Sequence, residues 1–514
     1  MSIEKDNKIL HFLRSERFSN YFPFILVALA SCMMLTNLGN HYLWQDEAQT
    51  ALISKTILVH GIPLGTDGKN FFSQEFGAEY GNGYVYRWHT WLPFYIVAGF
   101  FWLFGESNFI ARLPFAFMGI AIVVLQYYYG NFLWKNRRRA FLGAFLLLFT
   151  VPFLLLTREC RYYAPLILLT QASIFSYTLF VQNRRYASAL FVVSSVLLFH
   201  VQYLYCAVVL MAAGIHLVVF HRDRFIKFSI LCSVVVAINV PWIIWLSTIP
   251  YSSRYSNQFY TFSETILVAQ KYARQFFHYV LGFSFTVFTF LVIYLYALKQ
   301  KKIELPSGYR LQAYILIILF SVLLFIILIF TAPTQFFRYL GPIIPLACLL
   351  VVPLIVKSWN IHHFFGVISF LAFFIGKPLP SFFYELTHDY DGPIEGIVKY
   401  LNTHGNFTDT VAITYEDMPV KLYTGMRVVG GLTGEHLSQI KHAKWIIIRK
   451  HTIFEQEKVI RQYIRDSVDL SLYKAIVIDY PDIPFENREE PTEHLFKTAS
   501  HQTNDERVHI LQRL

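Results

Sequence analysis

Long apolar runs without polar alternation fill most of the first three quarters of the chain. The stretches 311–331 and 341–356 are too long and too poor in charge for core helices of a soluble protein. A helix needs about 20 apolar residues to cross a bilayer core of about 30 Å, because each residue adds about 1.5 Å. Backbone groups in lipid must pair within their own segment, so these runs are expected to be helical. The pattern predicts an α-helical polytopic membrane protein.

About eleven membrane-spanning helices are predicted. They are expected near 21–39, 109–131, 140–156, 163–181, 186–200, 204–220, 228–247, 276–298, 311–331, 340–356 and 363–379. The apolar segment 88–104 is also long enough to cross, but a crossing there would place the following basic clusters on the wrong side. We therefore interpret it as an interfacial or re-entrant helix at the outer face. With this count every basic cluster falls on the side of the N-terminus, which the positive-inside rule makes the cytoplasm.

The chain divides into three predicted parts: a cytoplasmic N-terminus (1–20), a transmembrane domain (21–379, with an outer loop at 40–108) and an extracytoplasmic domain (380–514). The last part alternates helix-like and strand-like stretches, which is typical of a small α/β domain. The expected strands are 410–415, 444–449 and 475–480, and the expected helices are 393–402 and 454–465.

Composition agrees with this assignment. Of the 514 residues, 55% are hydrophobic and 15% are charged, whereas soluble domains carry about a quarter charged residues. The net charge of +11 comes largely from short basic clusters between apolar runs. These clusters act as topology determinants, so nucleic acid is not expected as a partner. The five cysteines lie in or beside apolar runs, which argues against a disulfide scaffold.

Two adjacent carboxylates, Asp46 and Glu47, follow the first predicted span. A solvated pair that marks the end of a helix is the simpler interpretation. The functional interpretation is a general base at the edge of a water-filled cavity, which takes a proton from an acceptor hydroxyl.

Arginines on the predicted outer side form a second group of candidates. Arg158 and Arg161 lie in one outward turn, Arg338 precedes a late span, and Arg254 lies in an outward loop. A guanidinium fork suits phosphate oxygens. Pairing with Glu159, contact with lipid headgroups or anchoring of a helix end would explain the same residues.

Aromatic and histidine residues near these arginines complete the candidate pocket. They are Tyr162, Tyr163, His89, His200, Tyr203 and Tyr339. A histidine at a helix end is more often an interface residue than a metal ligand. No HExxH, CxxC, P-loop or dinucleotide motif is present, so no cofactor is indicated, and a divalent cation is compatible with the site without being required by a motif.

The order of these features resembles the GT-C superfamily of polytopic glycosyltransferases, and in particular the bacterial family-39-type enzymes, which include protein mannosyltransferases and lipid A aminoarabinose transferases. The resemblance rests on short motifs in a fixed order. These are Asp46-Glu47, Gly61-Ile62-Pro63, the Trp88–Pro93 segment, Gly105-Glu106-Ser107-Asn108 with Ala111-Arg112-Leu113-Pro114, Arg161-Tyr162-Tyr163, and Arg338-Tyr339 before Pro342 and Pro345.

The resemblance implies a polyprenyl-phosphate sugar as donor and inverting transfer to a lipid, glycan or protein acceptor outside the cytoplasm. It implies that Asp46 is the catalytic base beside Glu47, and that Arg87 stands near the family's donor-phosphate cation. The lysine-proline-proline run of aminoarabinose transferases is replaced here by Arg87-Trp88-His89-Thr90-Trp91, so neither aminoarabinose nor lipid A is implied. A bacterial inner membrane is the expected location.

Rival functions stay open at this point. A transporter or flippase for a lipid-linked anionic glycan would also use many helices and outward charges. A polysaccharide polymerase or ligase would use outward arginines without needing the acidic pair. Clustering of the charged candidates at one face, rather than at the midplane, favours the transferase.

Overall fold

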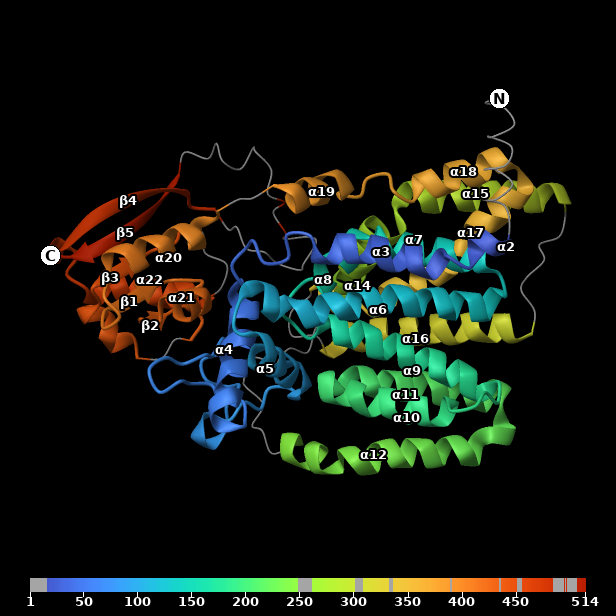
Figure 1. Ribbon diagram of the computed structural model, residues 1–514, viewed down its shortest axis with the longest axis horizontal. Coiled ribbons are helices and arrows are strands. Elements are labelled where there is room, and N and C mark those ends of the chain that lie inside the picture. The colour runs from blue at the N-terminus through green and yellow to red at the C-terminus, as the bar shows by residue number, and fades with distance from the viewer. Residues whose placement is uncertain are drawn as a thin grey trace.

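The computed structural model describes residues 16–247, 261–300, 308–331, 336–388, 391–433, 436–450, 455–483, 494, 496 and 506–514. A bundle of apolar helices carries a small α/β domain at one end (Figure 1). The N-terminal helix α2 (Glu16–Ser19) lies at the opposite end. We call the end next to the α/β domain the domain end.

Each predicted span coincides with a helix of the bundle or with a pair of helices. The bundle helices are α3 (Phe22–Leu35), α6 (Asn108–Trp134), α7 (Arg137–Leu148), α8 (Val151–Thr157), α9 (Tyr163–Val181), α10 (Ala187–Val201), α11 (Tyr203–Phe220), α12 (Phe225–Ser247), α15 (Phe283–Gln300), α16 (Tyr309–Thr331), α17 (Ile343–Ile361) and α18 (His363–Ala372). Within the described residues, 6 helices are long and apolar enough to cross a membrane, or up to 8 if each bent pair is one span. The count of eleven is therefore not confirmed.

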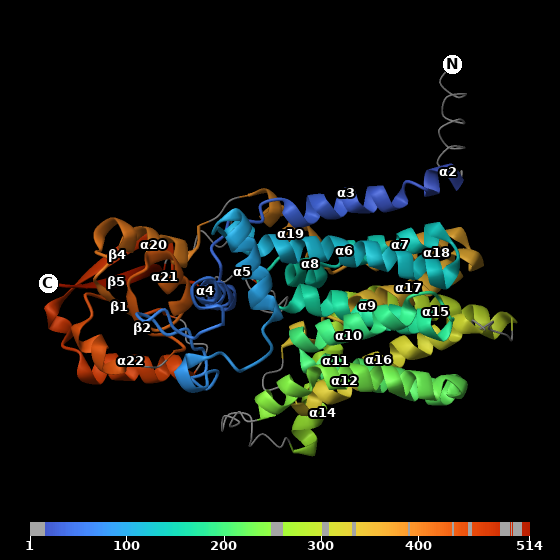
Figure 2. The same cartoon turned by 60° about the horizontal axis from the view of Figure 1, so that its bottom comes forward.

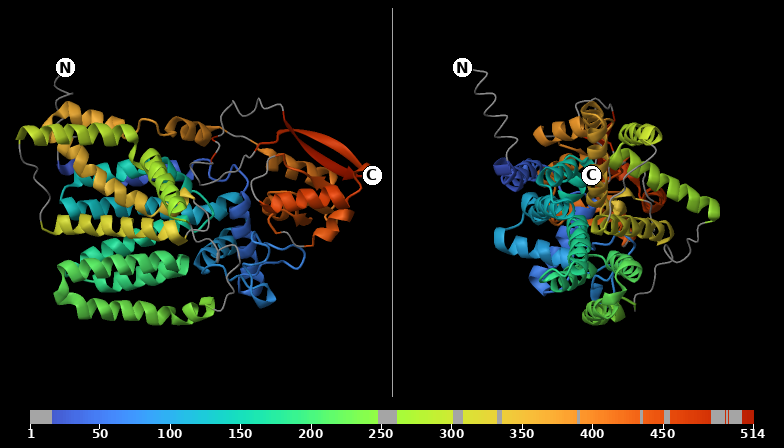
Figure 3. Two further views of the ribbon diagram at one scale, coloured as in Figure 1. Left: turned by 180° about the vertical axis from the view of Figure 1, so that it is seen from behind. Right: turned by 90° about the vertical axis from the view of Figure 1, so that its right-hand side faces the viewer.

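Helix α12 is apolar on all sides but buries only a narrow strip against the bundle. Only Phe228, Val235 and Asn239 are buried among its described residues, and the rest of the helix lies at the edge of the bundle (Figures 1 and 3). An apolar helix with one thin buried strip suits a hydrocarbon surrounding, because lipid accepts apolar side chains on every other face.

Two spans are broken near the domain end. Helices α7 and α8 meet at 70°, and the α14–η3 segment meets α15 at 81°. Helix α14 is Phe262–Phe276 and the π-helical turn η3 is Phe277–Leu281. Gly282 at the second break has φ +83, a conformation that glycine adopts at little cost.

A helix that the sequence pattern did not predict joins the bundle to the α/β domain. Helix α4 (Gln45–His60) lies between them in both views, beside α5 (Leu92–Phe104) (Figures 1 and 2). The short 3-10 turn η1 (Asn82–Tyr84) belongs to the same outer region. Helix α5 falls within the segment 88–104, where an interfacial or re-entrant helix was predicted.

The C-terminal part contains a five-stranded sheet in the order β2-β1-β3-β5-β4. Strands β1 (Thr410–Ile413), β2 (Arg427–Gly430) and β3 (Trp445–Ile447) are parallel, whereas β5 (Arg507–Arg513) runs antiparallel to β3 and β4 (Tyr473–Pro481). The remaining elements are α19 (Leu379–Thr387), α20 (Pro393–His404), α21 (Asp417–Thr424), η5 (Leu437–His442), α22 (Glu455–Ser467) and η6 (Leu470–Leu472). Three strands and two helices were predicted here and are confirmed, whereas β2, β5 and α21 were not predicted.

Candidate active site

The acidic pair forms the first turn of α4, at the domain end of the bundle. Trp44 is the N-cap residue, and its backbone N–H donates to Glu47 Oε2 at 3.4 Å. Carboxylates are favoured at this position, because the first turn of a helix presents unpaired N–H groups and the positive end of its dipole.

Glu47 is held in a closed ion pair. Arg112 donates from Nε to Oε1 at 2.8 Å and from Nη2 to Oε2 at 2.6 Å, and both side chains are buried. The backbone N–H of Cys160 donates to Oε1 at 2.7 Å. The other donors of Arg112 bond to the carbonyls of Leu38, His41 and Tyr42. This pair ties α6 to the start of α4, which favours a structural role for Glu47.

Asp46 lies between two arginines from distant parts of the chain. Its Oδ2 is 3.1 Å from Arg161 Nη2 and 3.4 Å from Arg338 Nη1. Arg161 Nη1 also donates to the Asp46 carbonyl at 3.2 Å and to the Thr50 hydroxyl at 3.1 Å. The three ionised side chains sum to one positive charge, so the group can attract an anion.

Three consecutive residues of the turn 158–161 form hydrogen bonds to the N-cap and the first turn of α4. Glu159 accepts a hydrogen bond from Trp44 Nε1 at 2.6 Å, while the next two residues bond to Glu47 and Asp46 as described above. Consecutive residues of one turn therefore hold the N-cap and both carboxylates of α4.

Aromatic rings surround the two arginines of the Asp46 group. The Arg338 guanidinium lies 4.2 Å from the ring centroid of Phe336 and 5.9 Å from those of Tyr163 and Tyr339. The Arg161 guanidinium lies 5.8 Å from the ring of Tyr162. The structure thus brings Tyr162, Tyr163 and Tyr339 around these arginines, and their role in a substrate pocket stays a prediction.

His89 packs at the same place but cannot supply charge. Its ring lies 5.6 Å from that of Tyr162 and stacks on Phe94 at 5.4 Å. Burial lowers the pKa of His89 to about 4, so the imidazole is neutral at pH 7. His89 can contribute a ring surface or a hydrogen bond to a substrate, but not a cation.

Arg158 has a different environment from Arg161. Its guanidinium donates to the carbonyls of Met33 and Met34 at 2.7 and 2.9 Å and of Thr36 at 2.8 Å. These bonds satisfy backbone groups at the C-terminal end of α3. The contacts of Arg158 favour a structural role and give no support to the predicted phosphate contact.

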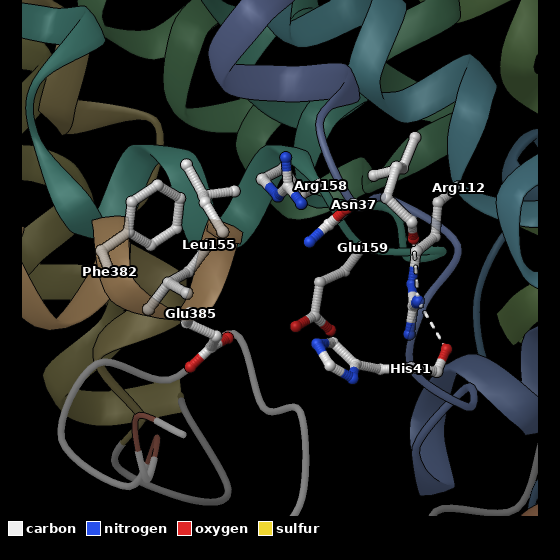
Figure 4. A pocket seen from close by; sticks show the side chains of 10 residues that line it. Asn37, His41, Arg112, Leu155, Arg158, Glu159, Phe382 and Glu385 are labelled. Atoms are coloured by element: carbon white, nitrogen blue, oxygen red, sulfur yellow. Dashed lines mark hydrogen bonds between the residues drawn. The ribbon is translucent and has the colours of Figure 1, made fainter. Parts of the chain in front are cut away.

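Arg158 and Glu159 face a small cavity of about 30 Å³ (Figure 4). His41 and Arg112 line it on one side, and Glu385 of α19 lines it on the other side. A volume of this size holds water molecules rather than a sugar.

The other predicted residues lie in a neighbouring aromatic cluster or outside the described residues. Arg87 donates from Nη2 to the Trp245 carbonyl at 2.6 Å, which anchors the end of α12. His200 packs edge-on against Trp242, and Tyr203 packs against Phe199. Arg254 lies outside the described residues. Within the described part of the chain, no three His, Cys, Asp or Glu side chains form a metal-binding group.

Sequence reasoning missed a buried carboxyl group in the outer loop. Glu79 contacts the Ser73 hydroxyl and accepts hydrogen bonds from the backbone N–H groups of Gln74 at 2.7 Å and Glu75 at 3.1 Å, and from Gln49 Nε2 at 3.2 Å. Burial raises the pKa of Glu79 to about 7. No local pattern marked this residue, because its partners come together only in the fold.

Comparison with solved structures identifies the architecture. The crystal structure of ArnT from Cupriavidus metallidurans bound to undecaprenyl phosphate superposes with a TM-score of 0.54, at 12% identity, over 95% of this chain and 97% of that chain. The chain has a GT-C fold. The apo structure of the same enzyme superposes with a TM-score of 0.53 at 12% identity, again over 95% and 97% of the two chains.

The structure confirms the fold class predicted from the apolar runs and the C-terminal pattern, a helical membrane protein with a small sheet, and the comparison confirms the GT-C resemblance of the fold. The cryo-EM structure of the arabinosyltransferase EmbB from Mycobacterium smegmatis overlaps with a TM-score of 0.41, at 13% identity, over 66% of this chain and 30% of that chain. This overlap is too weak to define a shared fold. No protein-family model matches the sequence, and a search of curated proteins finds no relative.

Proposed function

We propose that this GT-C protein is an inverting glycosyltransferase, which moves a sugar from a polyprenyl-phosphate donor to an acceptor hydroxyl at the periplasmic face of a bacterial inner membrane. The observation that carries the proposal is the position of Asp46. It lies within 3.4 Å of both Arg161 and Arg338, at the end of the bundle next to the α/β domain. The acceptor is a lipid, a glycan or a protein.

The arginines are suited to the donor phosphate. The phosphate of a polyprenyl-phosphate sugar gains negative charge as its bond to the anomeric carbon breaks, and preorganised guanidinium groups stabilise that charge. Arg161 and Arg338 enter from separate helix ends and are about nine-tenths buried. Low access of water strengthens their interaction with an anion.

Asp46 is suited to deprotonate the acceptor. Without donor, its carboxylate takes up hydrogen-bond donors of both arginines. A phosphate that binds the arginines competes for these donors and frees the carboxylate to accept a proton. The acceptor oxygen then attacks the anomeric carbon, the bond from that carbon to the phosphate oxygen breaks, and polyprenyl phosphate leaves with the electron pair. Attack from the face opposite the phosphate inverts the anomeric centre.

The lipid part of the donor fits an apolar helix bundle. ArnT, which shares the fold at 12% identity, has been solved with undecaprenyl phosphate bound. That finding concerns ArnT, and here it supports the choice of a polyprenyl phosphate as the lipid carrier to test first.

The experiment uses purified full-length protein in proteoliposomes of bacterial lipid extract. Undecaprenyl-phosphate esters of a radiolabelled hexose, pentose and amino-pentose serve as donors, and transfer of label to lipid, glycan or protein fractions is measured. Asp46→Asn is expected to lower turnover by about 10²–10⁴-fold, because a general base typically contributes that much.

Glu106→Gln is the matched control. Glu106 is a carboxylate of the same outer region, half exposed and paired with Lys55 at 2.8 Å. The Glu106→Gln variant should transfer sugar at the parental rate. Parental transfer by folded Asp46→Asn would contradict the proposal, and so would movement of intact labelled donor across the bilayer without sugar release.

A further inference from the structure

The α/β domain contacts the residue next to the proposed base. Gln45 is the first residue of α4 and is buried. Its Nε2 donates to Asp417 Oδ1 at 2.9 Å, and its Oε1 accepts the backbone N–H of Met418 at 3.2 Å. Both partners open α21, so the two helices meet at their N-terminal turns.

Asp417 is itself fixed by bonds within the α/β domain. Its Oδ2 accepts from Lys421 Nζ at 2.6 Å and from the Thr433 hydroxyl at 3.0 Å, and its Oδ1 also accepts from the Leu432 N–H at 3.1 Å. The side chains of Asp417 and Lys421 are fully buried. Lys421 neutralises the charge of Asp417. Asp417 therefore acts on Gln45 through a hydrogen bond of fixed direction and not through a long-range electrostatic field.

We propose that the α/β domain positions Asp46 through the hydrogen bonds of Asp417 and Met418 to Gln45. This inference rests on the proposed function of Asp46. Arg161 and Arg338 hold the Asp46 side chain from the bundle, and Gln45 fixes the preceding backbone from the domain side. Asp417 and Gln45 are positioning residues under this proposal. A displacement of about 1 Å at a reacting group can cost about 10²-fold in rate.

Gln45 is adjacent to Asp46 in the sequence, whereas other residues that contact the α/β domain are further from Asp46 along the chain. Asn70 of the outer loop also makes two hydrogen bonds to the α/β domain: Nδ2 donates to the Met426 carbonyl at 2.9 Å, and Oδ1 accepts from the Val428 N–H at 2.8 Å. Asn70 is likewise buried. It therefore serves as a control that weakens docking without touching the start of α4.

The test compares Gln45→Met with Asn70→Leu in the transfer assay described above, using the undecaprenyl-phosphate sugar that gives turnover. Each variant keeps the approximate side-chain volume and loses two hydrogen bonds to the domain. Gln45→Met is expected to lower kcat by about 10–10²-fold with an unchanged KM for the donor. Asn70→Leu is expected to keep the parental kcat. Parental kcat in Gln45→Met, or equal losses in both variants, would overturn the proposal.

A further variant tests the hydrogen bond itself. Gln45→Glu keeps the length of the side chain but replaces the donor that faces Asp417 Oδ1 by a carboxylate oxygen, so it should lower kcat. Parental kcat in a folded Gln45→Glu variant would contradict positioning through this bond.

Asp46→Asn in the same assay separates this proposal from the proposed function. Parental transfer by Asp46→Asn means that Asp46 is not the base. Loss of transfer in Asp46→Asn together with parental kcat in Gln45→Met means that the base is assigned correctly and positioning by the domain is wrong.

Discussion

Replacement of Glu47 or Asp46 by its amide should affect stability and turnover to different degrees. In Glu47→Gln, the buried Arg112 loses a partner that accepts from both Nε and Nη2 at 2.6–2.8 Å. Removing one partner of a buried ion pair costs about 3–5 kcal/mol, because the other charge stays buried without compensation. The carbonyls that also bond Arg112 place the expected loss at the lower end, about 3 kcal/mol.

Asp46→Asn removes a more accessible charge. The Asp46 side chain is 11% exposed and its two arginines are 12% and 13% exposed. Its contacts with the two arginines, at 3.1 and 3.4 Å, are also longer than those of the Glu47–Arg112 pair, so the loss of stability should be smaller than in Glu47→Gln. The main effect of Asp46→Asn should fall on turnover.

Thermal unfolding of both variants in the same detergent, followed by intrinsic tryptophan fluorescence, measures the difference. We expect a Tm several degrees below parental for Glu47→Gln and a smaller decrease for Asp46→Asn. A parental Tm for Glu47→Gln combined with loss of sugar transfer would refute the structural role of Glu47 and make it a candidate for the chemistry.

Three further outcomes are expected. Arg338→Ala should raise KM for the undecaprenyl-phosphate sugar about tenfold or more, since a charged hydrogen bond contributes about 1.5–3 kcal/mol, and an unchanged KM and kcat would remove Arg338 from the phosphate site. Arg158→Lys should lower Tm and leave the donor KM unchanged, because lysine cannot reach the same three carbonyls at the end of α3. A raised donor KM with a parental Tm would instead support a phosphate contact of Arg158. The pKa of Glu79 rises from 4.5 to about 7, so the stabilisation from its protonated form is complete below pH 4.5 and disappears as pH rises through about 7. Between pH 5 and 8 the parental Tm should therefore fall relative to that of Glu79→Gln, and equal pH dependence of the two proteins would contradict this.

The membrane helices could be predicted because their signal is local. A run of apolar residues must form a helix in lipid wherever it packs, so each predicted span coincides with a helix or a bent helix pair. Helix ends and breaks depend on packing between helices, which explains why segments such as 140–156 contain a 70° bend.

Helix α4 could not be predicted, since it lacks an amphipathic pattern. Most of its residues are buried, the polar Gln45, Gln49 and Ser54 among them, because it lies between the bundle and the α/β domain. Burial on all sides removes the alternation of apolar and polar faces that marks a surface helix. Strand β2 was missed because it has only two apolar residues, Val428 and Val429, and β5 was missed because it has charged residues at both ends.

Part of the candidate site could be predicted because several arginines lie on the predicted outer side of the membrane. The positive-inside rule disfavours arginine on the predicted outer side, which drew attention to Arg161 and Arg338, and the fold brings both to Asp46. The same reasoning could not separate Arg158 from Arg161, because capping of a helix end and contact with a carboxylate look alike in sequence. The partner of Glu47 was also hidden, since Arg112 lies 65 positions further along the chain.

The central claim is that Arg161 and Arg338 bind the phosphate of a lipid carrier next to the proposed base, Asp46. The most direct test is a cryo-EM structure of the full-length protein in nanodiscs with undecaprenyl phosphate. We predict phosphate density within hydrogen-bond distance of both guanidinium groups, with the Asp46 carboxylate released from at least one of them. Phosphate bound elsewhere, with the contacts of Asp46 to both arginines intact, would contradict the claim.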